Sequence, residues 1–153
     1  MKNKQQNKYT KQLIEFLEQS SNKGQNTITI PLQKKRKHYN SFVIHPIYKN
    51  SKIVAINTEK RVMPGDTYFC IKIFELVLQL LFDAEEQTLP KRNAQKYKMG
   101  ESGLESNTIE YAVAKKIYDK NDGDSTDRRI SVISNILIAS NLCISKPSIL
   151  KLI

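Results

Sequence analysis

The sequence has few of the residues and motifs from which catalytic and metal sites are usually built. Its 153 residues include only five glycines, two cysteines and two histidines, with no Gly-rich phosphate loop, HExxH motif or nucleophile elbow. Neither cysteine lies in a CxxC pair or beside a histidine, so zinc-ligand spacing is missing. No carboxylate pair or nucleophile lies near His38 or His45 in the chain. The sequence therefore predicts a non-catalytic protein with no cofactor, no metal and no small-molecule substrate.

Long apolar runs and a secretion signal are also missing. The longest apolar run, residues 69–82, is shorter than the roughly 20 residues that span a bilayer. The N-terminus, MKNKQQNKYT, has lysines but no apolar segment behind them, so we expect no signal peptide and no membrane. Cys70 and Cys143 both lie in apolar runs, which favours two buried, reduced thiols in an intracellular protein.

Positive charge is what the chain has in excess. A net charge of +10 favours a polyanionic partner such as nucleic acid. Residues 1–60 hold 12 Lys and Arg against 3 Asp and Glu, whereas residues 61–153 hold 13 against 12. Because affinity for a duplex comes largely from neutralised phosphates, we expect many of these contacts to come from the N-terminal part.

The N-terminal part is predicted to form a basic lobe over residues 9–62, behind a disordered basic arm at residues 1–8. The lobe is expected to contain a helix and three short strands. The helix is predicted over residues 9–19, and the strands over 27–32, 41–48 and 52–57, the last two forming a hairpin.

A basic cluster lies between the first two predicted strands. It consists of Lys34, Lys35, Arg36 and Lys37 and is followed by His38 and Tyr39. Basic side chains beside an aromatic ring can hold phosphate and stack on a base, and the run also resembles a nuclear-localisation signal. The alternative is a solvated loop that keeps an edge strand from pairing with other chains. A second, weaker basic patch contains Lys91-Arg92.

Residues 67–87 are predicted to form the most apolar helix. Only Lys72, Glu75 and Gln79 are polar between residues 69 and 82, so the helix must be covered on nearly every side. We expect the N-terminal lobe to cover part of it and a protein partner to cover the rest, because an open patch would promote aggregation. The predicted partner-binding side chains are Phe69, Ile73, Phe74, Val77 and Leu81.

Residues 63–153 have the order of elements that a winged helix requires. After the apolar helix come a long loop at 88–106, a helix over 109–118 capped by Thr108, a turn, a helix capped by Thr126 or Asp127, and a short hairpin. In the last helix, Ile130, Ile133 and Leu137 share the expected core face. The opposite face has little bulk, as a helix in the major groove needs. It carries Arg128, Ser131, Val132, Asn135 and Ala139.

The stretch Arg128-Arg129-Ile130-Ser131-Val132-Ile133-Ser134-Asn135-Ile136-Leu137 resembles the recognition helix of the DP (dimerisation partner) and E-two-factor transcription factors. The similarity continues through Ala139–Leu142 to Ile149, where that family has its wing hairpin. The resemblance implies a winged helix, a heterodimeric partnership, and guanine contacts from Arg128 and Arg129. Ser131-Val132 replaces the family's Tyr-Asp, so its DNA sequence preference is not carried over.

Together these features predict an α+β fold: a winged helix-turn-helix domain with an N-terminal helix and a small β-hairpin lobe. The expected function is that of a non-catalytic DNA-binding accessory or heterodimer subunit in a nuclear nucleic-acid-modifying or transcription complex. The alternative is a scaffold subunit whose winged helix docks a protein without contacting DNA. The predicted DNA-binding residues are Arg128, Arg129, Ser131, Asn135, Lys34, Lys35, Arg36 and Lys37.

Overall fold

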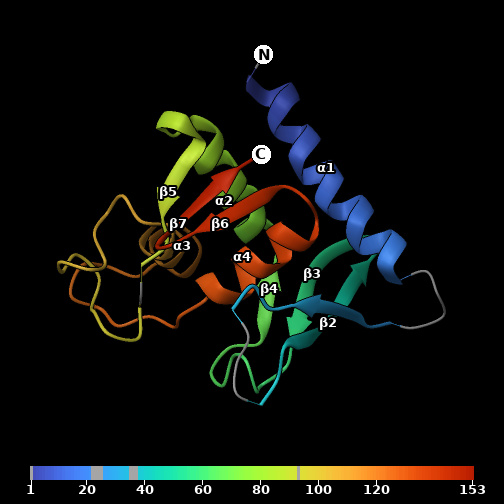
Figure 1. The fold of residues 1–153 in the computed structure, drawn as a ribbon, viewed down its shortest axis with the longest axis horizontal. Helices are drawn as coiled ribbons and strands as arrows, with labels where there is room; N and C mark the ends of the chain where they lie inside the picture. The colour runs from blue at the N-terminus through green and yellow to red at the C-terminus, as the bar shows by residue number, and fades with distance from the viewer. Residues whose placement is uncertain (1, 22–25, 35–37, 93) are drawn as a thin grey trace.

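The computed structural model describes residues 2–21, 26–34, 38–92 and 94–153, with side chains from Lys8 onward. In these ranges four α-helices and two small antiparallel sheets form an α+β fold (Figure 1). The elements are α1 (Lys2–Ser21), β1 (Ile28–Pro31), β2 (Ser41–Lys49), β3 (Lys52–Thr58), β4 (Tyr68–Cys70), α2 (Ile71–Asp83), the 3-10 helix η1 (Glu85–Gln87), β5 (Thr88–Pro90), α3 (Ile109–Tyr118), α4 (Ile130–Ala139), β6 (Cys143–Lys146) and β7 (Ile149–Leu152).

The first sheet is an antiparallel meander with strand order β1-β2-β3-β4. Its β2–β3 turn passes through Asn50 and Ser51, whose φ angles are 52° and 64°. Two-residue hairpin turns of this type need positive φ at both central positions, and the predicted hairpin is confirmed. Ile30 lies opposite Phe42 on the buried face, so the alternation of apolar residues sets which face of the sheet meets the core.

Helix α1 begins at Lys2, so the disordered arm predicted for residues 1–8 is replaced by helix from that residue. The physical reason is that lysine and glutamine are good helix formers, and the segment continues an amphipathic helix that packs on the core. Leu13 and Leu17 are fully buried, and the Tyr9 ring lies 6.2 Å from that of Phe82.

Helix α2 is the centre of the molecule, and it contacts α1, α3, β3 and β7. The predicted helix over residues 67–87 is divided into β4, α2 and η1, because a short apolar run fits a buried strand as well as a helix. All five side chains predicted to bind a partner have zero exposure in the chain by itself. The proposed partner surface is therefore core: the excess apolar residues are covered by the chain's own sheets and helices, not left for another protein.

The second sheet has the order β5-β7-β6 and is antiparallel throughout. β5 lies within the predicted long loop, which begins only after Pro90, because Thr88–Pro90 pairs with β7. The rest of that loop folds over α3 and buries a small separate cluster. The predicted α3 helix is confirmed with its bounds, and the Thr108 hydroxyl accepts the backbone N–H of Tyr111 at 3.3 Å.

One hydrophobic core joins the two predicted domains, 9–62 and 63–153, because side chains of α1 and the first sheet pack with those of α2, α3, α4 and β7. Cys70 and Cys143 are both free thiols, and burial raises the pKa of Cys143 to about 12. Across the described residues, no helix combines the length and hydrophobicity needed to cross a membrane.

Candidate nucleic-acid interface

The N-terminal end of α4 is held by a residue from another helix. α4 begins at Ile130, and its N-cap residue Arg129 makes no side-chain capping hydrogen bond. The predicted caps Thr126 and Asp127 are therefore not the N-cap. Instead Oε1 of Glu110, on α3, accepts the backbone N–H groups of Arg129 at 2.9 Å and Ile130 at 3.0 Å. Glu110 is 2% exposed, and its burial raises its pKa to about 7 although the two N–H groups favour the charged form.

Arg129 points into the protein. Its guanidinium carbon lies 3.6 Å from the ring centroid of Tyr118, and its Nη2 lies 3.4 Å from Asp127 and 3.6 Å from Asp66. Its side chain is 6% exposed. This corrects the prediction that Arg129 contacts DNA, because the guanidinium joins α3, α4 and the segment before β4 and is not presented to solvent.

Arg128 is arranged in the opposite way. It is half-buried, and its guanidinium makes no hydrogen bond or ion pair with any described residue; its Nε is buried without a partner. Lys91, just after β5, lies near enough that burial and the charge of Arg128 both lower its pKa. The Lys91 ammonium donates to Ser145 Oγ on β6 at 2.7 Å. We call Lys91 and Arg128 the cationic pair.

Part of the α4 face that was predicted to enter the major groove is buried. Asn135 is 6% exposed; its Oδ1 accepts the backbone N–H of Gln33 at 3.0 Å, and its Nδ2 donates to the Ser131 carbonyl at 2.6 Å. Val132 is also buried. The prediction that Asn135 reads DNA is therefore corrected: the residue fastens the segment after β1 onto α4. Ser131 remains half-buried at the surface.

The predicted basic cluster is only partly placed by the structure. Lys34 is exposed and follows Gln33, so it lies beside α4. Lys35, Arg36 and Lys37 lie outside the described residues.

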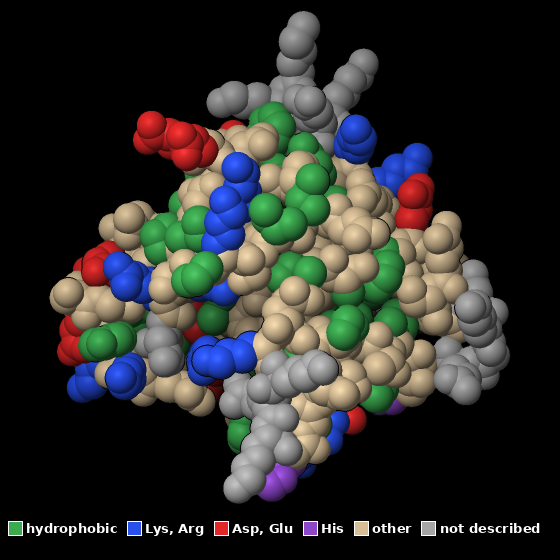
Figure 2. All heavy atoms as spheres, in the orientation of Figure 1, with side chains coloured by type: hydrophobic (Ala, Val, Ile, Leu, Met, Phe, Trp, Pro, Cys, Tyr) green, Lys and Arg blue, Asp and Glu red, His purple; other side chains and the backbone are tan. Residues whose placement is uncertain are grey.

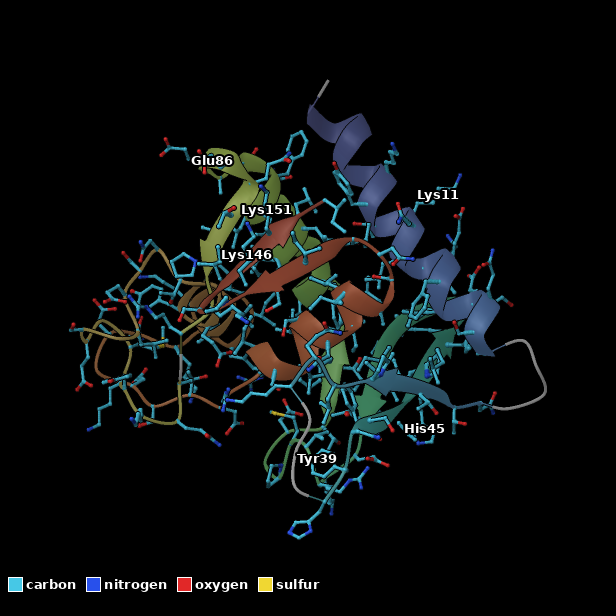
Figure 3. The ribbon with its side chains drawn as sticks, in the orientation of Figure 1. Lys11, Tyr39, His45, Glu86, Lys146 and Lys151 are labelled. Carbon is cyan, nitrogen blue, oxygen red and sulfur yellow. The ribbon has the colours of Figure 1, made fainter. Side chains whose placement is uncertain are left out.

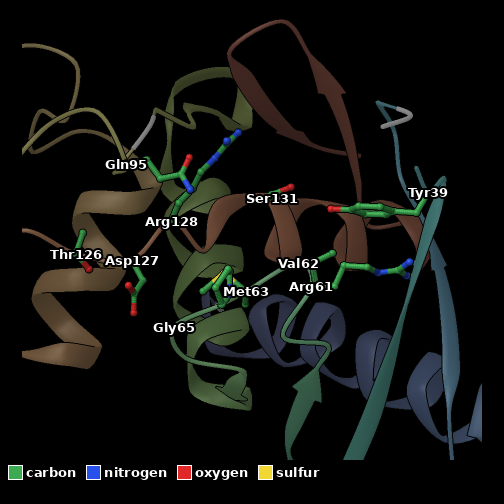
Figure 4. Close-up of a pocket in the computed structure, with 11 residues that line it drawn as sticks. Tyr39, Arg61, Val62, Met63, Gly65, Gln95, Thr126, Asp127, Arg128 and Ser131 are labelled. Atoms are coloured by element: carbon green, nitrogen blue, oxygen red, sulfur yellow. The ribbon is translucent and has the colours of Figure 1, made fainter. Parts of the chain in front are cut away.

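A hollow of about 350 Å³ lies over the first turns of α4 (Figure 4). Tyr39 and Arg61 are at one end, Arg128 and Gln95 at the other, and Ser131 lies between them. The Arg61 guanidinium lies 4.3 Å from the Tyr39 ring centroid. Sequence reasoning missed this site because its lining comes from four separated segments. The lining residues are Tyr39, Arg61, Val62, Met63, Pro64, Gly65, Gln95, Thr126, Asp127, Arg128 and Ser131.

The β6–β7 hairpin adds further basic side chains next to the cationic pair. Lys146 is exposed on β6, and Lys151 lies at the surface of β7 opposite Ile144 (Figure 3). In the space-filling view most acidic side chains lie towards the edges of this face, while Lys and Arg side chains also occur near its middle (Figure 2). Within the described ranges, no group of three His, Cys, Asp or Glu side chains is placed to hold a metal ion.

This arrangement has the chemistry of an anion-binding surface. Two cations have no carboxylate partner among the described residues, hydroxyl groups lie beside them, and the flanking hairpin carries further lysines. The resemblance to the DP family covers residues 128–137 and continues to Ile149, and it stays a prediction. The two arginines carried over from it, Arg128 and Arg129, point in different directions in the structure. Comparisons of this chain with protein-family models, with curated proteins and with solved structures find no match.

Proposed function

We propose that the protein is a non-catalytic DNA-binding subunit that holds duplex backbone through a surface centred on the cationic pair. The proposal includes a winged helix over α2, β5, α3, α4, β6 and β7. What supports that topology is the element order, helix-strand-helix-helix-hairpin, together with the sheet order β5-β7-β6. In such a domain the hairpin is the wing, and the cationic pair lies between the wing and α4.

The observation that carries the proposal is the cationic pair itself. Two like charges held close together destabilise the free protein, because each disfavours the charged form of the other. Lys91 is half-buried, burial and the charge of Arg128 lower its pKa, and its ammonium donates a hydrogen bond to the neutral hydroxyl of Ser145. A phosphate placed between the two side chains would compensate both charges. Structural arginines are normally matched by carboxylates, as Arg129 is. A pair that no described carboxylate matches therefore favours an external anion.

The covered face of α4 determines how a duplex would approach. The segment after β1 covers Asn135. For that reason α4 would not lie in the major groove over its whole length. Arg128 and Ser131, at its N-terminal end, would approach the duplex first. Lys146 and Lys34 would flank them and contact the backbone on either side. Phosphate contacts fix position and carry little sequence information, so we expect weak sequence selectivity.

Fluorescence anisotropy of a labelled random-sequence duplex at several salt concentrations tests this proposal. Each phosphate contact contributes about 0.9 to the slope of log affinity against log salt. The double variant Lys91→Gln/Arg128→Gln is expected to lower the slope by about 1–2 for that reason and to weaken binding at low salt. The matched control is Lys11→Gln, which removes an exposed cation on α1, away from this surface (Figure 3). Equal slopes for the double variant and the control would contradict the proposal.

A second candidate function, protein docking without DNA, is favoured by one observation. Ile144 is 42% exposed on β6 and Ile153 is 65% exposed at the end of the chain, and β6 is an edge strand. A partner could pair with that edge and cover both side chains. Such docking would replace the partner surface predicted on α2 and is compatible with a heterodimer. Lack of duplex binding, together with a partner lost in an Ile144→Lys variant, would favour this function.

A further inference from the structure

We infer that the hollow over α4 holds one unpaired nucleotide of the bound nucleic acid, with its base against Tyr39 and its phosphate at Arg128. The inference rests on the proposed function, because Arg128 also belongs to the cationic pair that the proposed function uses. It adds a preference: DNA with an unpaired or extruded nucleotide should bind more tightly than fully paired duplex.

The size and lining of the hollow fit a single nucleotide. Its volume of about 350 Å³ lies at the low end of the range of about 300–1,000 Å³ for small-ligand sites, and it is too small for a base pair with its backbone. Val62, Met63 and Pro64 provide an apolar wall, while Thr126 and Ser131 add hydroxyl groups. An aromatic base in such a site would be sandwiched by apolar atoms and hydrogen-bonded at its edge.

Tyr39 is a fixed platform for stacking. The Arg61 guanidinium lies 4.3 Å from its ring centroid. Arg61 is itself held by Glu59, 2.8 Å from Nη2, and by the Ser41 carbonyl oxygen at 3.3 Å. The ring is therefore positioned before any ligand arrives, which lowers the entropy lost on binding. Stacking on an aromatic side chain tolerates any base, because every base has a π-face.

The charges around the hollow set the orientation of the nucleotide. The charge of Arg61 is matched by Glu59, whereas Arg128 has no such partner among the described residues. The phosphate therefore belongs at the Arg128 end and the base at the Tyr39 end, which lie on opposite sides of the hollow in Figure 4. The N–H groups of Arg129 and Ile130 are taken by Glu110, so the helix end itself is not the anion site.

Asp127 lies at the Arg128 end of the hollow, away from Tyr39 (Figure 4). One of its oxygens lies 3.4 Å from Arg129 Nη2, and the carboxylate lines the hollow. The ion pair with Arg129 offsets the negative charge of Asp127, which reduces its repulsion of a phosphate held at Arg128.

The test compares three labelled DNAs by fluorescence anisotropy: a short paired duplex, the same duplex with one unpaired 2-aminopurine, and the corresponding single strand. Tyr39→Leu removes the ring while keeping bulk, and Tyr39→Phe is the matched control that keeps the ring. Circular dichroism establishes that both variants fold. Quenching of 2-aminopurine fluorescence reports stacking at the unpaired position directly.

We expect the wild-type protein to bind the DNA with the unpaired base at least about five-fold more tightly than the paired duplex, the lower end of what one stacked base contributes. Tyr39→Leu should lose this preference and the quenching, and Tyr39→Phe should keep both. Equal affinities for the two duplexes, or an unchanged preference in Tyr39→Leu, would overturn the inference and leave the proposed function intact.

Two further outcomes distinguish a failure of the proposed function from a failure of this inference alone. Failure to bind any of the three DNAs would overturn both the proposed function and this inference. Free nucleoside monophosphates are the second control. If they displace the DNA and bind as tightly as the duplex with the unpaired base, the site takes a free nucleotide, and the assignment to a nucleotide within a strand is overturned.

Discussion

Glu110 on α3 caps the N-terminus of α4 by accepting the backbone N–H of Arg129 at 2.9 Å. Its Oε1 also accepts the N–H of Ile130 at 3.0 Å, so one buried oxygen satisfies two groups that a helix end normally leaves free. The same contact fixes the turn that separates Arg128 from Arg129. The surface proposed to bind DNA therefore depends on a carboxyl group that is 2% exposed.

Glu110 is expected to make stability fall as pH rises towards neutrality. Its pKa is raised to about 7 in the folded protein, against about 4.3 for an unfolded glutamate, so between these values the folded state binds the proton more tightly. The contribution of Glu110 to the free energy of unfolding is fully present below the lower pKa and lost by about pH 7, and it amounts to at most about 4 kcal/mol.

Urea unfolding of wild type and Glu110→Gln at several pH values measures this effect. Glutamine keeps the oxygen that accepts both N–H groups and cannot ionise, so the variant should lack this part of the pH dependence. Other carboxyl groups titrate in both proteins, and the difference between the two curves isolates Glu110. Parallel curves between pH 5 and 7 would rule out a raised pKa for this residue.

Arg129→Lys is expected to destabilise the protein and to leave the DNA affinity of the folded fraction nearly unchanged. Lysine keeps the charge but loses the planar guanidinium that stacks on Tyr118 and reaches Asp66 and Asp127 together. Because both carboxylates are partly exposed, we expect a loss of about 2 kcal/mol, less than for a fully buried pair. Thermal unfolding and duplex anisotropy provide the two readouts. A large drop in duplex affinity without a drop in thermal stability would show that Arg129 contacts DNA.

Asn135→Ala is expected to loosen the segment after β1 from α4. The variant leaves the Gln33 backbone N–H without its side-chain acceptor, which costs about 1 kcal/mol because Gln33 is exposed and water can replace part of the lost bond. Hydrogen exchange at the Gln33 amide should speed up, while amides at the centre of α2 should change only through global stability. An unchanged exchange rate at Gln33 would show that the contact does not hold the segment.

Leu81→Ala tests whether the apolar residues of α2 are core or partner surface. Leu81 has zero exposure in the chain alone, so truncation should cost about 2–5 kcal/mol. Lys72→Ala, an exposed position on the same helix, is the control and should stay within about 0.5 kcal/mol of wild type. A small effect of Leu81→Ala on the isolated chain would mean that this side chain is free, as the sequence alone predicts.

Local patterns in the sequence predicted much of the fold. Alternation predicted the β2–β3 hairpin, and the helical period together with the Thr108 cap predicted α3. Ile130, Ile133 and Leu137 were correctly assigned to the core face of α4. These features depend on neighbours a few residues apart, so a single sequence contains the necessary information.

The rest depends on contacts between distant segments. Nothing in the α4 sequence indicates that Gln33 will lie on Asn135, or that Glu110 will cap α4, because both contacts join residues far apart in the chain. Arg128 and Arg129 look alike in sequence, and only the surrounding carboxylates and Tyr118 decide which of them turns inward. Lys91 was recognised as basic, but its place beside Arg128 follows from β5 joining the second sheet.

In the proposed function, Lys91 and Arg128 form a like-charged pair that destabilises the free protein and is compensated by phosphate. The most direct test is the thermal unfolding midpoint of wild type and Arg128→Gln, each with and without a random-sequence duplex at low salt. We expect Arg128→Gln alone to melt at a higher temperature than wild type, because repulsion with Lys91 is relieved. The duplex should raise the midpoint of wild type clearly and that of the variant much less. A variant that melts lower than wild type and is stabilised equally by the duplex would contradict the account.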